Sequence, residues 1–112
     1  GANRQQIATS TTSNSQIYAG IVRTFGAITA DSHILSVIYN GANSFVYVDN
    51  VAKLSNTNAG TQPINQGYNL MCEISGALPF DGYLSEYIIY NSDQSANRTG
   101  IETNINDYYT IY

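Results

Sequence analysis

Apolar and polar residues alternate in the middle of the chain with the rhythm of a β-hairpin. The runs at 33–39 and 44–49 are rich in β-branched and aromatic residues, and residues 40–43, which begin Asn-Gly, separate them. An Asn-Gly step between two such runs is a strong hairpin signal, because both residues tolerate a positive φ. The pattern predicts a hairpin over residues 33–54.

The second arm of this hairpin also predicts two different faces. Phe45, Tyr47 and Asp49 alternate there with Val46, Val48 and Asn50. Side chains of a strand point alternately to opposite sides, so one of these sets should be buried and the other at least partly wet.

Three further runs have the composition of strands, namely 16–22 with an extension to Phe25, 68–74 and 83–90. In the last of them large apolar side chains fall on both parities, which is typical of a central strand covered on two faces. Gly, Pro, Asn and Ser dominate residues 55–67 and 75–79, and this composition predicts a loop and a turn.

The end of the chain has a helical period instead. Ile101, Ile105, Tyr108 and Tyr109 follow the i, i+4, i+7, i+8 spacing of an amphipathic helix. Ser95 is one candidate N-cap, and Thr99 followed by Glu102 offers a capping box slightly later. We expect a short helix that closes the domain.

Composition agrees with a single β-rich domain. The chain has 112 residues, of which 43% are hydrophobic and 11% charged, with ten Tyr and nine Gly. Strand formers punctuated by turn formers predict an all-β fold. Residues 1–15 are polar and are expected to be a loop or tail, which leaves residues 16–112 as one domain.

Charge excludes some partners. The net charge is −4, and the four basic residues are scattered along the chain. Nucleic-acid binding needs clustered Lys and Arg, so no nucleic-acid partner is expected. No stretch approaches the ~18 uninterrupted apolar residues of a spanning helix, so no membrane insertion is expected.

The residue types give little support for a metal site or a catalytic nucleophile. One Cys72 and one His33 do not supply the ligand spacings of a zinc site. Cys72 is expected to be a small buried residue. No G-x-S-x-G elbow accompanies His33, which is expected to be solvated or bonded to a backbone group at a strand end.

Residues 80–90, FDGYLSEYIIY, resemble a known superfamily. They fill the pattern f-G-x-i-x-E-x-x-i-Y with Phe80, Gly82, Leu84, Glu86, Ile89 and Tyr90. The arm SFVYVDNVAKL and the closing SANRTGIETNINDYYTIY extend the likeness. Over residues 16–112 the chain resembles the C-terminal part of concanavalin A-like, laminin G-like jelly-roll domains of the lectin and glucanase superfamily.

This resemblance implies an antiparallel jelly-roll β-sandwich with a short C-terminal helix. Such sandwiches often run to roughly 200 residues, so this chain supplies about half to two thirds of the strands. The fold is then either a reduced sandwich or one completed by a partner chain or an upstream segment. Asp49-Asn50 stands where the family usually has a Gly, and Asn also enters the left-handed region.

A glycosidase of this superfamily would need paired carboxylates facing one cleft. The E-x-D-x-x-E motif of the related glucanases is absent. Asp81 and Glu86 come nearest to a pair, with Asp81 in a turn and Glu86 inside the run 83–90, while Glu73 stands alone. Glu86 is expected to be a structural carboxylate bonded to backbone or Tyr hydroxyl groups, and no catalytic residue is assigned.

Binding is therefore the favoured function. Aromatic faces pack against the C–H surfaces of sugars, and amides and carboxylates bind their hydroxyl groups. The candidate ligand-binding residues are Tyr68, Tyr83, Asp81, Asn43 and Asn50. The resemblance also makes calcium a candidate cofactor, with Asp49 and Asp81 as its ligands, and the alternative for both is an Asx-turn cap.

Two kinds of non-catalytic function stay open. The first is a lectin-like domain of a phage, viral or bacterial surface protein that binds a glycan or cell-surface receptor. The second is a structural or assembly module, such as a capsid decoration or fibre-tip domain, whose open edge recruits neighbouring chains. Both imply a location on a virion or outside the cell, and a glycosidase remnant ranks behind them.

Overall fold

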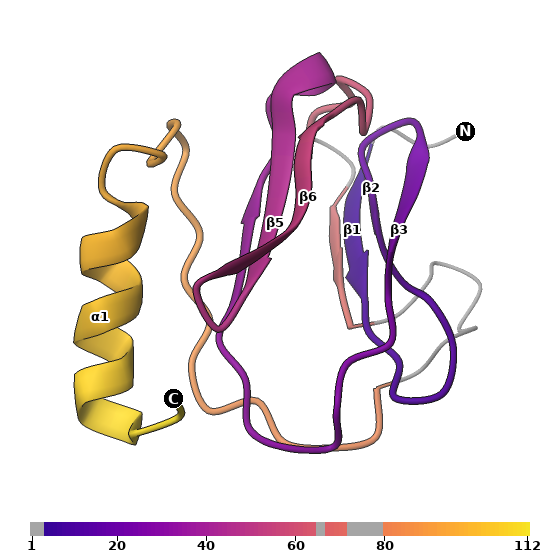
Figure 1. Ribbon diagram of the computed structural model, residues 1–112. Helices are drawn as coiled ribbons and strands as arrows, with labels where there is room; N and C mark the ends of the chain where they lie inside the picture. Colours follow the sequence, from indigo (N-terminus) through magenta and orange to yellow (C-terminus); the bar gives the residue numbers. More distant parts are fainter. Residues whose placement is uncertain (1–3, 65–66, 72–79) are drawn as a thin grey trace.

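The computed structural model describes residues 4–64, 67–71 and 80–112 (Figure 1). Its strands are β1 (Gln5–Ala8), β2 (Ser15–Tyr18), β3 (Val22–Gly26), β4 (Leu35–Ile38), β5 (Ser44–Val48), β6 (Val51–Thr57) and β7 (Tyr68–Leu70). A 3-10 turn (Gly41–Asn43) precedes β5, and the helix α1 (Arg98–Tyr109) follows the strands. The chain is thus mostly β with one short C-terminal helix in its described part, as the composition predicts.

The strands form two sheets. One has the order β3-β2-β1-β7 and the other the order β4-β5-β6. Neighbouring strands are antiparallel except β1 and β7, which are parallel. The expectation of a purely antiparallel fold is wrong at this pair. A long connection rather than a hairpin turn leads to β7, so chain geometry does not force it to run antiparallel.

The core lies between the sheets. Its buried members are Ile7 and Ile17 of one sheet, Val46 of the other, and Ala59 of a loop. Half-buried side chains surround them: Phe25, Leu35, Val37, Tyr39, Leu54, Tyr68 and Met71. Packing of two sheets through apolar inner faces is the arrangement of a β-sandwich.

The predicted hairpin is confirmed. β4 and β5 pair antiparallel, with Ile38 opposite Phe45. Gly41 has φ +54° in the connection, whereas Asn40 has φ −142°, so only the Gly of the Asn-Gly step uses a positive φ. In β5 the side chains of Val46 and Val48 are buried and those of the other parity are half-buried, so the alternation predicts the two faces correctly.

The next turn, between β5 and β6, consists of Asp49 and Asn50, with φ 51° and 64°. Both residues lie in the left-handed region that a tight turn of this kind requires. Asn enters this region more readily than most residues with a side chain, which suits Asn50 to the turn. This turn brings the carboxylate of Asp49 to the end of the sheet.

The N-terminal half differs from the sequence-based expectation. β1 lies within the segment expected to be a loop or tail, where only Ile7 and Ala8 contribute to the core. The single run predicted over 16–22 is two strands, β2 and β3. Gly20, with φ +115°, turns the chain between them.

A loop packs tightly against this turn. β6 extends to Thr57, so the loop expected over 55–67 begins later. The carbonyl of Ala59 accepts hydrogen bonds from the backbone N–H groups of Ala19 and Ile21, at 2.9 and 3.0 Å. A Cβ at Gly60 would stand 2.2 Å from the carbonyl oxygen of Ala19, so this approach requires glycine.

Residues 83–90, called here the exposed strip, are not a central strand. They belong to neither sheet, and their large side chains are half-exposed or more. Strand pairing requires hydrogen bonds to a neighbouring strand, and no described strand pairs with these residues. One ring still packs inward, since Tyr87 lies 6.0 Å from Tyr68 between centroids.

The helix is confirmed, but it begins between the two predicted starts, after Ser95 and before Thr99. Its N-cap is Asn97. Arg98 docks it on the β5–β6 turn, because its guanidinium donates to the Oδ1 of Asn50 at 2.9 Å and lies 3.6 Å from the centroid of Tyr47. The same guanidinium pairs with the buried carboxylate of Glu102. No helix of the described residues is long and apolar enough to cross a membrane.

Several expectations concern residues outside the described ranges. They are the burial of Cys72, the place of Glu73, the end of the run 68–74 and the turn at 75–79.

Candidate functional site

A hollow of about 300 Å³ lies where three connecting segments meet. It is called here the hydroxyl groove. It is lined by Thr9, Ser10, Thr11, Thr12, Ile28, Thr29, Ala30, Asp31, Phe80 and Asp81. The first four residues follow β1, the next four follow β3, and the last two precede the exposed strip, so loops over a rigid sheet build the site.

Hydrogen bonds hold the first wall in shape. The hydroxyl of Ser10 accepts the backbone N–H groups of Thr12 and Ser13 at 3.2 and 2.9 Å. This is the local turn that Ser and Thr side chains favour. The backbone N–H of Ile28 donates to the carbonyl of Ser10 at 2.8 Å, which ties the second wall to the first.

The third wall carries an aromatic ring. Phe80 is 40% exposed and lines the groove. Its ring lies against the backbone of Gly82, where a Cβ would stand 2.8 Å from the ring atom Cζ. Gly82 therefore leaves the space in which the phenyl ring stands.

The groove contains polar groups that the protein itself does not use. Among the described residues, no hydrogen bond or ion pair engages the side chains of Thr11, Asp31 or Asp81. Hydroxyl and carboxylate groups in this condition are open to a polar ligand.

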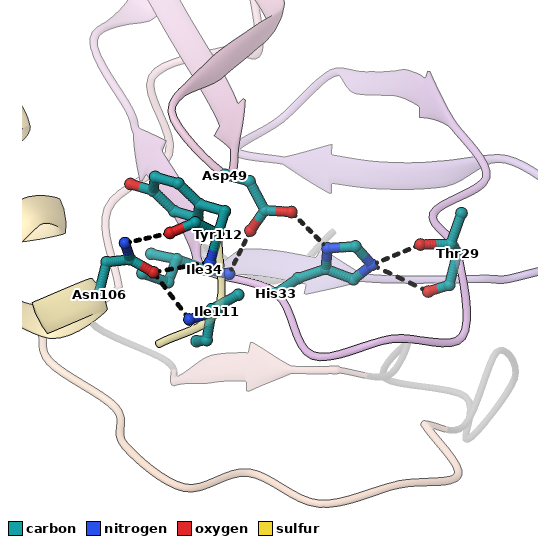
Figure 2. A network of polar contacts seen from close by, with 7 residues as sticks. All are labelled: Thr29, His33, Ile34, Asp49, Asn106, Ile111 and Tyr112. Carbon is teal, nitrogen blue, oxygen red and sulfur yellow. Dashed lines mark hydrogen bonds and ion pairs between the residues drawn. The ribbon is translucent and has the colours of Figure 1, made fainter. Parts of the chain in front are cut away.

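His33 lies behind the second wall (Figure 2). Its Nδ1 is 2.7 Å from Oδ2 of Asp49, and its Nε2 is 3.0 Å from the carbonyl oxygen and 2.9 Å from the hydroxyl of Thr29. Oδ1 of Asp49 accepts the backbone N–H of Ile34 at 2.9 Å. The contacts join the loop after β3 to the β5–β6 turn.

This geometry favours the imidazolium form of His33. A carboxylate and a carbonyl oxygen only accept, so both ring nitrogens carry a proton when both bonds form. Burial lowers the pKa of His33, but the hydrogen bonds with Asp49 and Thr29 and the charges of Asp49 and Asp31 outweigh it, so the pKa lies above its ordinary 6.5.

The order Thr29, His33, Asp49 looks like a nucleophile triad but does not work as one. A general base must present a free lone pair on Nε2 to the hydroxyl group. Here the carbonyl of Thr29 lies at hydrogen-bond distance from the same nitrogen and requires it to donate. The arrangement is a structural clamp, called here the His33 clamp.

The same contacts decide how well Asp49 fits calcium. Both of its carboxylate oxygens are engaged, one with His33 and one with Ile34, and calcium takes six to eight oxygen ligands. The described residues contain no group of three or more His, Cys, Asp or Glu that could hold a metal ion. Asp49 is already hydrogen-bonded at both oxygens and Asp81 presents an open carboxylate in the groove, so calcium at either residue stays a prediction.

The sequence-derived ligand residues are dispersed. Asp81 lines the groove. Tyr83 projects from the exposed strip and is 98% exposed. Asn43 is exposed at the end of the 3-10 turn. Asn50 binds Arg98. Only Asp81 of this set belongs to the groove.

Tyr68 is a half-buried packing residue and does not line the groove. Its ring makes an edge contact with Tyr39 at 6.3 Å and a tilted contact with Tyr87 at 6.0 Å, both between centroids. Burial raises the pKa of Tyr68 and of Tyr39 far above the ordinary value, because it disfavours the phenolate form.

Glu86 stands on the exposed strip and not in the groove. It borders a second hollow, of about 450 Å³, between the strip and one face of α1. Desolvation and the nearby carboxylate of Glu86 raise the pKa of Tyr109. Asp81 lines the groove and Glu86 lines this second hollow, so the two carboxylates do not line a common hollow.

Sequence reasoning missed most of the groove. The only available signal was the run of Thr and Ser at residues 9–13, which reads as a polar loop. Comparison with protein-family models, with curated proteins and with solved structures finds no match for this chain. A functional conclusion therefore rests on the groove and the strip.

Proposed function

We propose that the protein is a non-catalytic, lectin-like domain that binds a glycan, free or on a cell-surface receptor, in the hydroxyl groove. One observation carries the proposal: a single hollow combines the half-exposed ring of Phe80 with unengaged hydroxyl groups and the open carboxylates of Asp31 and Asp81. A sugar ring needs these partners, an aromatic face for its C–H surface and acceptors for its hydroxyl groups.

The braced walls support the same proposal. The bonds at Ser10 and the His33 clamp hold both loops before any ligand arrives. A preformed site loses less conformational entropy on binding, which matters for sugars because their hydroxyl groups are already well solvated.

The finer assignment of the fold belongs to this proposal. A concanavalin A-like jelly roll rests on the sequence resemblance, and two facing sheets with a closing helix are compatible with it. A place on a virion or on the outside of a cell follows from the proposed ligand.

A glycan-array screen of the purified chain tests the function, with calcium in one arm and a chelator in the other. Specific binding by a chain that melts cooperatively is the expected result. Loss of binding with chelator would show that binding needs a metal ion, and silence from a folded chain would contradict the proposal.

The exposed strip favours a second candidate, an assembly module. Tyr83, Leu84, Tyr87, Ile88, Ile89 and Tyr90 form a run of exposed apolar side chains, and such patches mark contacts with other chains. A backbone that pairs with no described strand also suits strand addition.

A second copy of this chain is the occupant that the strip fits. Antiparallel pairing about Tyr87 would set Tyr87 opposite itself and Leu84 opposite Tyr90. It would set Glu86 opposite Ile88, so that no like charges meet. The strip is in this sense self-complementary.

Sedimentation velocity across a concentration series tests this candidate. A defined dimer is expected, and Ile88→Glu should abolish it because each new carboxylate faces Glu86 of the other copy. Ile88→Gln is the uncharged control and should weaken the dimer less. A monomer at every concentration would contradict the assembly function.

A further inference from the structure

Two carboxylates give the hydroxyl groove a negatively charged lining. Asp31 and Asp81 line it, and none of its lining residues is Lys, Arg or His. Ion pairs among the described residues engage neither carboxylate. Both side chains are exposed, so they are charged groups in contact with any bound ligand.

The basic residues of the chain lie elsewhere. Arg23 donates to the carbonyl of Asn58 at 2.6 Å, and Arg98 binds Asn50 and Glu102. Arg4 lies over the ring of Tyr18 at 4.6 Å, and Lys53 is on β6. None of the four lines the groove.

His33 presents no free ring nitrogen to the groove. Both ring nitrogens of His33 are directed to protein acceptors, Asp49 on one side and Thr29 on the other (Figure 2). Any positive charge on this ring lies beside the carboxylate of Asp49, and His33 does not line the groove.

We infer that the groove selects sugars by charge: it accepts neutral and amino-bearing sugars and excludes those that carry carboxylate or sulfate groups, with Asp31 and Asp81 as the residues that discriminate. This inference rests on the proposed function. Carboxylates accept hydrogen bonds from sugar hydroxyl and ammonium groups, and these charge-assisted bonds are strong. The same carboxylates repel an anionic sugar at short range.

The apolar part of the groove does not discriminate in this way. Phe80, Ile28 and Ala30 contact a sugar through its C–H surface, whatever its charge. The two carboxylates alone therefore discriminate between anionic and uncharged sugars. Replacing them should abolish this discrimination and leave the contact between the sugar and Phe80 in place.

The affinities of sugars that differ in charge test the inference. Three probes have comparable length: a tetramer of glucosamine, a tetramer of N-acetylglucosamine and a tetramer of galacturonate. In parallel, lactose is compared with sialyllactose. We expect the uncharged or amino member to bind roughly tenfold more tightly than the anionic one at low salt. The ratio should shrink as salt rises, because screening weakens the repulsion.

The variant Asp31→Asn with Asp81→Asn removes both charges and keeps the side-chain size. It should bring the ratio of affinities close to one. The matched control is Asp107→Asn, which removes a carboxylate on α1 that does not line the groove, and it should leave the ratio unchanged.

The possible results distinguish a failure of the charge selectivity from a failure of glycan binding itself. Binding with tighter affinity for the anionic probes, or a ratio that the double variant does not change, would overturn the inference and leave the proposed function in place. No binding to any probe of either series, or on the glycan array, would overturn the proposed function and this inference with it.

Discussion

Nδ1 of His33 lies 2.7 Å from Oδ2 of Asp49, while Nε2 of the same ring faces the carbonyl of Thr29. The pair joins two loops that are 16 residues apart in sequence, and one of them forms a wall of the hydroxyl groove. The protonation of His33 therefore bears on both stability and the shape of the site.

The stability of the protein should depend on pH through His33. Its pKa is raised in the folded state, so the folded state binds the proton more tightly than the unfolded chain. The stabilisation is fully present below the ordinary pKa of 6.5 and is lost as pH rises through the higher folded value. The free energy of unfolding of the wild type should fall across this window. In His33→Gln it should not, and an equal fall in both would refute the clamp.

The negative charge of Asp49 and its acceptor oxygen should contribute separately to the stability of the protein. Asp49→Ala removes the contact with His33 and the acceptor for Ile34, at a cost of about 2–3 kcal/mol in urea unfolding. Asp49→Asn keeps an acceptor and tolerates the positive φ, so it should cost about 1 kcal/mol. Equal losses in the two variants would show that the Ile34 bond contributes nothing.

Two glycines with positive φ should respond differently to alanine. Gly60→Ala meets the Ala19 carbonyl and should cost about 2–4 kcal/mol. Gly26 also has positive φ, but nothing lies within 4 Å of a Cβ there, so Gly26→Ala should cost about 1–2 kcal/mol of backbone strain. Urea denaturation of both variants isolates the clash, and a Gly60→Ala protein no less stable than Gly26→Ala would disprove the close packing.

Tyr68 and Tyr83 are both candidate ligand-binding residues from the sequence, but their replacement by alanine should change the stability of the protein by different amounts. Tyr68→Ala removes a ring packed on Tyr39 and Tyr87 and should cost about 2–4 kcal/mol. Tyr83 is almost fully exposed, so Tyr83→Ala should change stability by less than about 0.5 kcal/mol. Thermal melts of the two variants provide the comparison, and similar melting temperatures would contradict the packing of Tyr68.

The sequence predicts the fold best where local signals suffice. The hairpin follows from an Asn-Gly step and from alternation in β5, and α1 follows from its period. β1 was missed because its four residues contain two apolar ones. The exposed strip is wrongly predicted as a central strand because apolar residues fall on both of its parities. That pattern shows that the side chains can be buried, but strand pairing also needs a neighbouring strand, which composition does not specify.

The site was predictable only in part for a similar reason. Asp81 was a candidate because it lies beside Phe80 and Gly82 in a turn. The other walls come from residues 9–12 and 28–31, which no short motif connects with residue 81. Their meeting depends on sheet order, and in particular on the parallel pairing of β1 with β7, which local patterns do not reveal.

The most direct test of glycan binding in the hydroxyl groove is isothermal titration of a glycan from the array into two variants, Phe80→Ala and Tyr108→Ala. Phe80 lines the groove, whereas Tyr108 is 80% exposed on α1 and does not line it. Phe80→Ala should weaken binding roughly tenfold with little change in the melt, and Tyr108→Ala should bind as the wild type does. Equal affinity in the two variants, or a loss confined to Tyr108→Ala, would contradict glycan binding in the hydroxyl groove.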